Sequence, residues 1–333
     1  MSATPPRPMA ASHDAAGDAS PATAAGRVAP GQPDWNKPAR LRQALRDRLA
    51  RAGRGQPTLI APGVYDAYGA RMVQHAGFEA VYMTGNGVSA SLLGRPDVGL
   101  VDLTMITSHA RRVAACVDLP LICDADTGYG AAAAIRRTVE EFEAAGVAAI
   151  HIEDQQSPKR CAQFPGARAV LPFDVAVSRI AAAVAARAPT GLLVIGRTDC
   201  AASMGLDEAI RRARAFADAG VDAVFVELKA HDNVLEDIRA VTAQIEIPCM
   251  INLDSGGPLA ALRFPDLAGL GIALAIYPGL LRNALGYTMR EALGHLRNDG
   301  STQAMRDRML TGAEYSAYLG LPDVEEWEGR FPA

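Results

Sequence analysis

Three acidic side chains follow two apolar runs in the middle of the sequence. Asp124 and Asp126 end the run LICDAD, and Glu153 ends the run IHIE. On a strand, residues two positions apart point to the same face. Asp124 would therefore share a face with Asp126, and His151 would share a face with Glu153. Carboxylates that converge without a partner repel one another and tend to remain protonated. A divalent cation bound between them would remove that cost.

The donor atoms indicate which metal such a cluster would bind. A set made only of oxygens favours a hard ion, so we expect Mg²⁺, with Mn²⁺ as an alternative, and not zinc. Each residue also has an ordinary structural role: Asp126 could be a helix N-cap and His151 a hydrogen-bonded core residue. Arg197 and Glu227, which follow later runs, could form an interior ion pair.

The segment SPKRCAQFPG has a composition typical of a reactive loop. It places Cys161 directly after Lys159 and Arg160 and just before a phenylalanine, a proline and a glycine. Neighbouring cations favour the thiolate form of a cysteine, so the setting indicates chemistry. The alternative is an ordinary surface thiol. By contrast, Cys123 and Cys249 lie within apolar runs and are expected to be packing residues.

Composition excludes several classes of protein. The chain has 333 residues, of which 49% are hydrophobic, and a net charge of −4. We expect no nucleic-acid partner, because the chain has no basic footprint, and no membrane partner, because no apolar stretch reaches the roughly 20 residues that span a bilayer. The chain has five cysteines without a C-x-x-C pair and no secretory signal, which favours a cytoplasmic location. Residues 1–36 are poor in large apolar side chains and are expected to be disordered.

Eight short apolar runs alternate with helical patterns from Thr58 onward. The runs cover residues 58–63, 80–85, 119–126, 148–154, 192–199, 222–227, 247–254 and 271–278. The stretches AGFEAVYM, AGVAAIHI and AGVDAVFV form a partial internal repeat. This alternation predicts a (β/α)₈ barrel of the TIM type, whose active site lies at the C-terminal ends of the strands. The alternative is a doubly wound open sheet, but no G-x-G-x-x-G motif follows the first run. We expect the barrel over residues 37–298 and a helical extension over 299–333.

The chain resembles the isocitrate lyase / phosphoenolpyruvate mutase superfamily, in its branch of 2-methylisocitrate and dimethylmalate lyases. The matching stretches, in order, are MTGNGVSASLLGRPDVG, CDADTGYG, HIEDQ, PKRC, GRTD, FVE and IN. The resemblance implies a direct metal contact through Asp124, and metal-bound waters held by Asp97, Asp126 and Glu153. It also implies a set of residues that bind the substrate: Tyr82, Thr84, Gly85, Asn86, His151, Arg197 and Asn252.

The resemblance further implies a carbon–carbon lyase that cleaves a small 2-hydroxy di- or tricarboxylate to a 2-oxo acid and a carboxylate. Cys161 would protonate the departing carbanion, Lys159 and Arg160 would stabilise the thiolate, and Arg197 and Glu227 would complete the catalytic set. The lyases usually continue Cys-Gly-His, whereas this chain has Ala162 and Gln163, and glutamine cannot take up a proton at neutral pH.

Three alternatives remain open on the sequence. The first is an oxaloacetate decarboxylase or hydrolase, and the second is a carboxyphosphonoenolpyruvate mutase-like enzyme. Cys161 argues against the mutases and decarboxylases, which generally lack the loop cysteine, and Pro278 argues for the lyases over the hydrolases. The third is a barrel that binds a metal and a carboxylate without catalysis. The resemblance also implies a homotetramer that exchanges its C-terminal helices, with Trp327 as an anchor in the tail.

Overall fold

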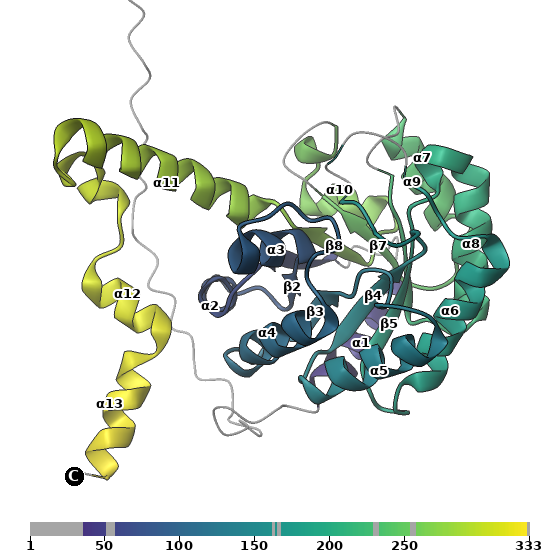
Figure 1. The fold of residues 1–333 in the computed structure, drawn as a ribbon, viewed down its shortest axis with the longest axis horizontal. Coiled ribbons are helices and arrows are strands. Elements are labelled where there is room, and N and C mark those ends of the chain that lie inside the picture. The colour runs from purple at the N-terminus through teal and green to yellow at the C-terminus, as the bar shows by residue number, and fades with distance from the viewer. Residues whose placement is uncertain are drawn as a thin grey trace, which may run out of the picture.

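The computed structural model describes residues 36–50, 57–161, 164, 168–228, 233–253 and 258–331. The predicted disordered segment lies outside these ranges except for Asn36, and so do Ala162 and Gln163. Eight parallel strands, β1 to β8, close into a barrel in chain order (Figure 1). They are β1 (Leu59–Val64), β2 (Val81–Met83), β3 (Leu121–Asp124), β4 (Ala149–Glu153), β5 (Leu193–Thr198), β6 (Ala223–Val226), β7 (Cys249–Asn252) and β8 (Leu274–Tyr277).

The predicted (β/α)₈ barrel is therefore confirmed, and the open-sheet alternative is wrong. The deciding contact is the parallel pairing of β1 with β8, in which Leu59 lies opposite Leu274. Helices surround the strands: α2 (Ala67–His75), α3 (Gly85–Leu93), α4 (Leu103–Ala115), α5 (Ala132–Ala144), α6 (Phe173–Ala186), α7 (Ala201–Met204), α8 (Leu206–Asp218), α9 (Val234–Thr242), α10 (Phe264–Gly269) and α11 (Leu280–Asp299). On α5 the periodic residues Ile135, Val139 and Phe142 are buried, as their spacing predicts.

Several strands end before their apolar runs do, and two of these early ends, those of β2 and β3, lie at the site. The run 80–85 becomes a strand only as far as Met83, because Thr84 is the N-cap of α3 and Gly85 is its first helical residue. The run 119–126 becomes a strand only as far as Asp124. Asp126 then adopts a left-handed backbone with φ of 48°. Its side-chain direction is therefore set by the loop and not by strand alternation.

Helix α1 (Lys37–Ala50) packs against the N-terminal ends of the strands, away from the predicted site. Its buried residues Leu41 and Leu45 join the apolar cluster inside the barrel, which includes Leu59 and Leu274, the first residues of their strands. The ammonium group of Lys37 donates to the carbonyls of Ala114 and Val117, at 2.7 and 2.6 Å. This end of the barrel is thus filled, and the opposite end remains for function.

The C-terminal helices extend away from the barrel (Figure 1). Helix α11 has no buried residue in the single chain, and it is followed by α12 (Gly312–Leu319) and α13 (Leu321–Arg330). Helix α12 returns to α2, where the rings of Tyr68 and Tyr315 lie 5.7 Å apart. Within the described ranges, no helix is long and apolar enough to cross a membrane.

Candidate active site

A cavity opens at the C-terminal ends of the barrel strands, where the sequence places it. Eleven of the residues predicted for the site line it: Tyr82, Thr84, Asn86, Asp97, Asp124, Glu153, Lys159, Arg160, Cys161, Arg197 and Asn252. Pro278 and Arg282 complete the lining. Gly85, Asp126, His151 and Glu227 lie immediately behind this lining. The barrel therefore gathers residues from strands that are distant in the sequence.

Asp124 ends β3 with its carboxylate against the start of α3. A side chain on Gly85 would place a Cβ atom 2.7 Å from Asp124 Oδ2, so glycine is required for this close approach. The backbone N–H of Asp126 donates to Asp124 Oδ1 at 3.0 Å. Burial alone would raise the pKa of Asp124, but nearby His151 and Lys159, together with Arg197, lower it to about 2. Asp124 is therefore an ionised, acceptor-only group at the base of the cavity.

Lys159 connects the cysteine loop to two of the predicted metal-site carboxylates. Its Nζ lies 2.7 Å from Asp97 and 2.7 Å from Asp126 Oδ1, and all three side chains are buried. The ammonium group thus points to these carboxylates, whereas the sequence predicts a role beside the thiolate. Burial and the charges of Asp124 and Asp97 raise the pKa of Asp126 to about 7, against the effect of Lys159. The N-cap alternative for Asp126 is wrong, because the N-cap of α5 is Ala131.

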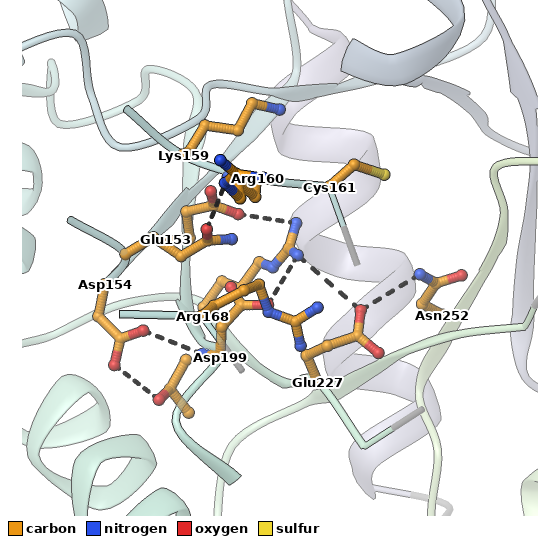
Figure 2. Close-up of polar contacts among 12 residues, drawn as sticks. Glu153, Asp154, Lys159, Arg160, Cys161, Arg168, Asp199, Glu227 and Asn252 are labelled. Atoms are coloured by element: carbon orange, nitrogen blue, oxygen red, sulfur yellow. Dashed lines mark hydrogen bonds and ion pairs between the residues drawn. The ribbon is translucent and has the colours of Figure 1, made fainter. Parts of the chain in front are cut away.

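Arg197 is held by carboxylates on three strand ends. Its guanidinium lies 3.0 Å from Glu153 Oε2, 3.0 Å from Asp199 Oδ1 and 3.8 Å from Glu227 Oε2. Asn252 in turn donates to Glu227 Oε2 at 3.3 Å (Figure 2). These contacts fix the plane of the guanidinium, which a bidentate grip on a carboxylate requires. The interior ion pair considered for Arg197 and Glu227 is thus part of a larger network.

Residues not predicted from the sequence hold this network in place. Asp199 accepts from Arg197 and also pairs with Arg168 at 3.2 Å, beyond the cysteine loop. Asp154 accepts from the backbone N–H of Asp199 at 2.9 Å and from Thr198 Oγ1 at 2.7 Å (Figure 2). The ends of β4 and β5 are therefore joined by side chains. The sequence offered one signal for these residues: Asp154 directly follows Glu153, and Asp199 lies two positions after Arg197.

Tyr82 and His151 form a buried pair beneath the cavity. The Tyr82 hydroxyl lies 2.9 Å from His151 Nε2, and His151 is fully buried. Burial lowers the pKa of His151 to about 4, so the ring is neutral near pH 7. Its Nδ1 lies 3.7 Å from Asp124 Oδ1. The structure thus places His151 as a hydrogen-bonded core residue that supports Tyr82 and Asp124, outside the cavity lining.

The oxygen donors fit a hydrated hard cation. Glu153 Oε1 is buried and has no hydrogen-bond partner in the described part of the chain, and its burial raises the pKa of Glu153 well above the ordinary value. Among those same residues, no three His, Cys, Asp or Glu side chains converge closely enough to hold a metal directly. Mg²⁺ is usually bound by one or two carboxylates and keeps several waters. Asp124 as the direct ligand, with Glu153 receiving a metal-bound water, would satisfy that pattern.

Cys161 lies at the mouth of the cavity beside residues from two helices. Asn86, on α3, donates from Nδ2 to the Cys161 sulfur at 3.0 Å. Arg282, on α11, donates to Asn86 Oδ1. The backbone N–H of Arg160 donates to Gln155 Oε1 at 3.0 Å, which fixes the start of the loop. Arg282 was not predicted, since it lies on the helix that follows β8 and not at the strand end itself.

Together these features define a (β/α)₈ barrel enzyme whose cavity, at the C-terminal ends of the strands, is lined by both carboxylates and cationic side chains. The chain belongs to the phosphoenolpyruvate phosphomutase family, whose model matches residues 47–297. Curated relatives of the chain are named as lyases or mutases, and one solved relative is described as a member of the PEP mutase/isocitrate lyase superfamily. The predicted family and enzyme class are confirmed.

Two curated relatives match most of the chain. The 2,3-dimethylmalate lyase of Eubacterium barkeri is 36% identical over 82% of this chain and 93% of its own length. The 2-methylisocitrate lyase of Shewanella oneidensis is 36% identical over 86% of this chain and 94% of its own length.

Two solved structures share the fold. One is oxaloacetate acetylhydrolase with the inhibitor 3,3-difluorooxalacetate (TM-score 0.81, 30% identity, covering 90% of this chain and 98% of that one). The other is phosphonopyruvate hydrolase with oxalate and Mg²⁺ (TM-score 0.74, 28% identity, covering 88% and 99%).

Proposed function

We propose that the protein cleaves the C2–C3 bond of a small 2-hydroxy di- or tricarboxylate, of the 2-methylisocitrate or dimethylmalate type, in the presence of Mg²⁺. The products are a 2-oxo acid and a carboxylate. One observation carries the proposal: a thiol, three arginines and an ionised Asp124 line the same cavity at the barrel rim. Acids, cations and metal-binding oxygens are the groups that this reaction requires.

The substrate's carboxylates are held by cations and by backbone N–H groups. Arg197 presents a fixed guanidinium to the C1 carboxylate, and the first turn of α3, from Thr84, offers N–H groups at a helix N-terminus. Arg282 also lines the cavity and would supply a second positive charge for the distal carboxylate. A dicarboxylate therefore has a partner at each end, which favours it over a monocarboxylate.

Bond cleavage passes the hydroxyl proton to solvent water, turns the C2–O bond into a carbonyl and leaves the bonding electrons on C3. The carbanion at C3, delocalised into its carboxylate, takes the proton of the Cys161 thiol, and the sulfur becomes a thiolate that regains a proton from solvent before the next turnover. Lys159 balances the negative charges of Asp97 and Asp126 next to the site of reaction. When bound, Mg²⁺ would act as a Lewis acid toward the developing 2-oxo acid, held by Asp124 and, through waters, by Asp97, Asp126 and Glu153.

Oxaloacetate hydrolysis is the second candidate. It is favoured by the structural similarity to oxaloacetate acetylhydrolase, the relative with a TM-score of 0.81. The reaction requires a water that attacks C2, and cleavage of the C2–C3 bond then leaves a C3 carbanion that also takes up a proton. Cys161 would be the acid in either reaction, so the preference for the lyase rests on Pro278, which lines the cavity and argues for the lyases over the hydrolases.

A substrate panel tests the proposal directly. The full chain is incubated with Mg²⁺ and with 2-hydroxy and 2-oxo di- and tricarboxylates, and release of a 2-oxo acid is followed through a coupled dehydrogenase. We expect turnover of at least one branched 2-hydroxy di- or tricarboxylate. Consumption of oxaloacetate alone, with oxalate and acetate as products in place of a 2-oxo acid, supports the hydrolase. Binding of Mg²⁺ and oxalate, seen as a rise in thermal stability, without product from any compound supports the non-catalytic barrel and overturns the proposal.

We also propose a cytoplasmic homotetramer that exchanges its C-terminal helices. Helix α11 exposes an apolar set in the single chain: Leu285, Tyr287, Met289, Leu293 and Leu296 are each about half exposed or more. Trp327 and Phe331 on the tail are more than 60% exposed. Apolar surface of this extent in a monomer is unusual, and burial against a second copy would remove it from water.

A further inference from the structure

The side chain of Asn86 joins three separate elements at the mouth of the cavity. It begins on α3, donates from Nδ2 to the sulfur of Cys161 on the β4–α6 loop, and accepts at Oδ1 from Arg282 on α11. The first distance is 3.0 Å. All three side chains are half-buried, so solvent competes only partly for these bonds.

The chemistry of Arg282 fixes the direction of the Asn86 amide. A guanidinium has only donors, so the amide must turn its oxygen toward Arg282. The NH₂ group must then face Cys161, and the sulfur must accept. Consequently the thiol's own proton is directed away from Asn86 and is available to the cavity. A neutral or negative residue in place of Arg282 would leave the amide free to turn over.

We propose that Asn86 is a positioning residue for Cys161: its amide, oriented by Arg282, directs the thiol proton into the cavity and stabilises the sulfur once that proton has left. This inference rests on the proposed role of Cys161 as proton donor. An N–H donor to an anionic sulfur is a charge-assisted hydrogen bond, which is stronger than the bond to the neutral thiol. The interaction is therefore strongest after the proton has been delivered.

Alkylation of the full chain by iodoacetamide, without substrate, measures the reactivity of this sulfur. Labelling at each cysteine is followed by peptide mass spectrometry at one fixed pH. Two substitutions of nearly the same size, Asn86→Leu and Asn86→Asp, remove the donor without opening the cavity. We expect labelling of Cys161 to slow about fivefold in the first and tenfold or more in the second, since the carboxylate also repels the anionic sulfur.

Two controls separate this effect from misfolding and from charge. Cys123 and Cys200 are buried, so their labelling rises only if the chain opens. Asn298→Asp adds the same charge at an exposed position of α11 and is expected to leave the Cys161 rate unchanged. Labelling of Cys161 within twofold of the wild-type rate in Asn86→Leu, with Cys123 and Cys200 still protected, would overturn the proposal.

A double-substitution cycle tests the link through Arg282. Arg282→Met should slow labelling of Cys161 in the wild-type background. The factor by which it slows labelling should be at least threefold smaller in the Asn86→Leu background, because the amide is already absent. A guanidinium that acts only through its charge would slow both backgrounds equally, and that result would overturn the link. The experiment needs no substrate. A substrate panel that yields no product would therefore count against the proposed reaction without affecting the labelling result. Unchanged labelling of Cys161 would likewise count against the role of Asn86 without affecting the proposed reaction.

Discussion

The ammonium nitrogen of Lys159 lies 2.7 Å from Asp126 Oδ1 in the buried base of the cavity. Lys159 is only 5% exposed and Asp126 only 8%. Asp97 shares the same ammonium group. Lys159 is therefore a counter-ion for the acidic site, and it ties the cysteine loop to two distant parts of the chain.

Removal of this counter-ion should destabilise the fold. Lys159→Met leaves Asp97 and Asp126 buried with less compensating charge, and we expect the free energy of unfolding to fall by about 3 kcal/mol. Denaturant titration measures the change. The control is Arg136→Met, which breaks a pair with Glu140 whose side chains are 74% and 52% exposed, and which should change stability by about 0.5 kcal/mol or less. Equal effects of the two substitutions would contradict the assignment.

Gly85→Ala should damage the site more than the fold. The added methyl group would lie 2.7 Å from Asp124 Oδ2, so the carboxylate must move away from its position. We expect kcat/KM on the identified substrate to fall at least about a hundredfold, because small displacements of a reacting group have effects of this size. Gly269→Ala on α10 has no atom within 4 Å of its new Cβ and is the matched control. Retention of wild-type activity in Gly85→Ala would show that the close approach is unimportant.

The neutral state of His151 should be visible in the pH dependence of stability. The folded-state pKa of about 4 lies below the ordinary value of 6.5, so the unfolded chain takes up the proton first as the pH falls. Stability should therefore decrease between about pH 6.5 and pH 4, by about 3 kcal/mol for this group. His151→Gln does not titrate but can still bond to Tyr82. Denaturant titrations from pH 7 to pH 4 should show a smaller decrease in this variant, and parallel curves would contradict the assignment.

The exposed face of α11 should be an interface between copies of the chain. Leu293 is 62% exposed in the single chain, and an aspartate there would place a charge inside the proposed interface. We expect sedimentation velocity to show a tetramer for the wild-type protein and smaller species for Leu293→Asp. Val175→Asp on α6, where the residue is 44% exposed, should leave the assembly intact. A monomeric wild-type protein would refute the exchange of helices.

The barrel was predictable because each apolar run is short, continuous and followed by a helical period, which is the pattern of strands buried on both faces. The strand ends also located Asp124, Glu153, Arg197 and Asn252 on one rim. Within a strand, the alternation of side chains between the two faces suffices to predict where each side chain points. The family and the class of enzyme followed from the motifs at those ends.

The remaining parts of the site depend on loops and on long-range contacts. Asp126 faces Lys159 because of a left-handed backbone at φ 48°, which the parity of a strand could not reveal. The position of Lys159 depends on where its loop folds back, and local sequence indicated only that it adjoins a cysteine. Arg282 meets Asn86 across 196 positions of sequence, so only the closed barrel brings them together.

The proposed reaction depends most on the sulfur of Cys161 as the source of the proton. With a substrate from the panel, Cys161→Ser should lower kcat by about a hundredfold or more, because the serine hydroxyl is a far weaker acid than the thiol. Binding of oxalate with Mg²⁺, measured by calorimetry, should stay within a fewfold of the wild-type affinity, and Cys116→Ser should leave kcat unchanged. A Cys161→Ser enzyme that releases 2-oxo acid at the wild-type rate would contradict the account.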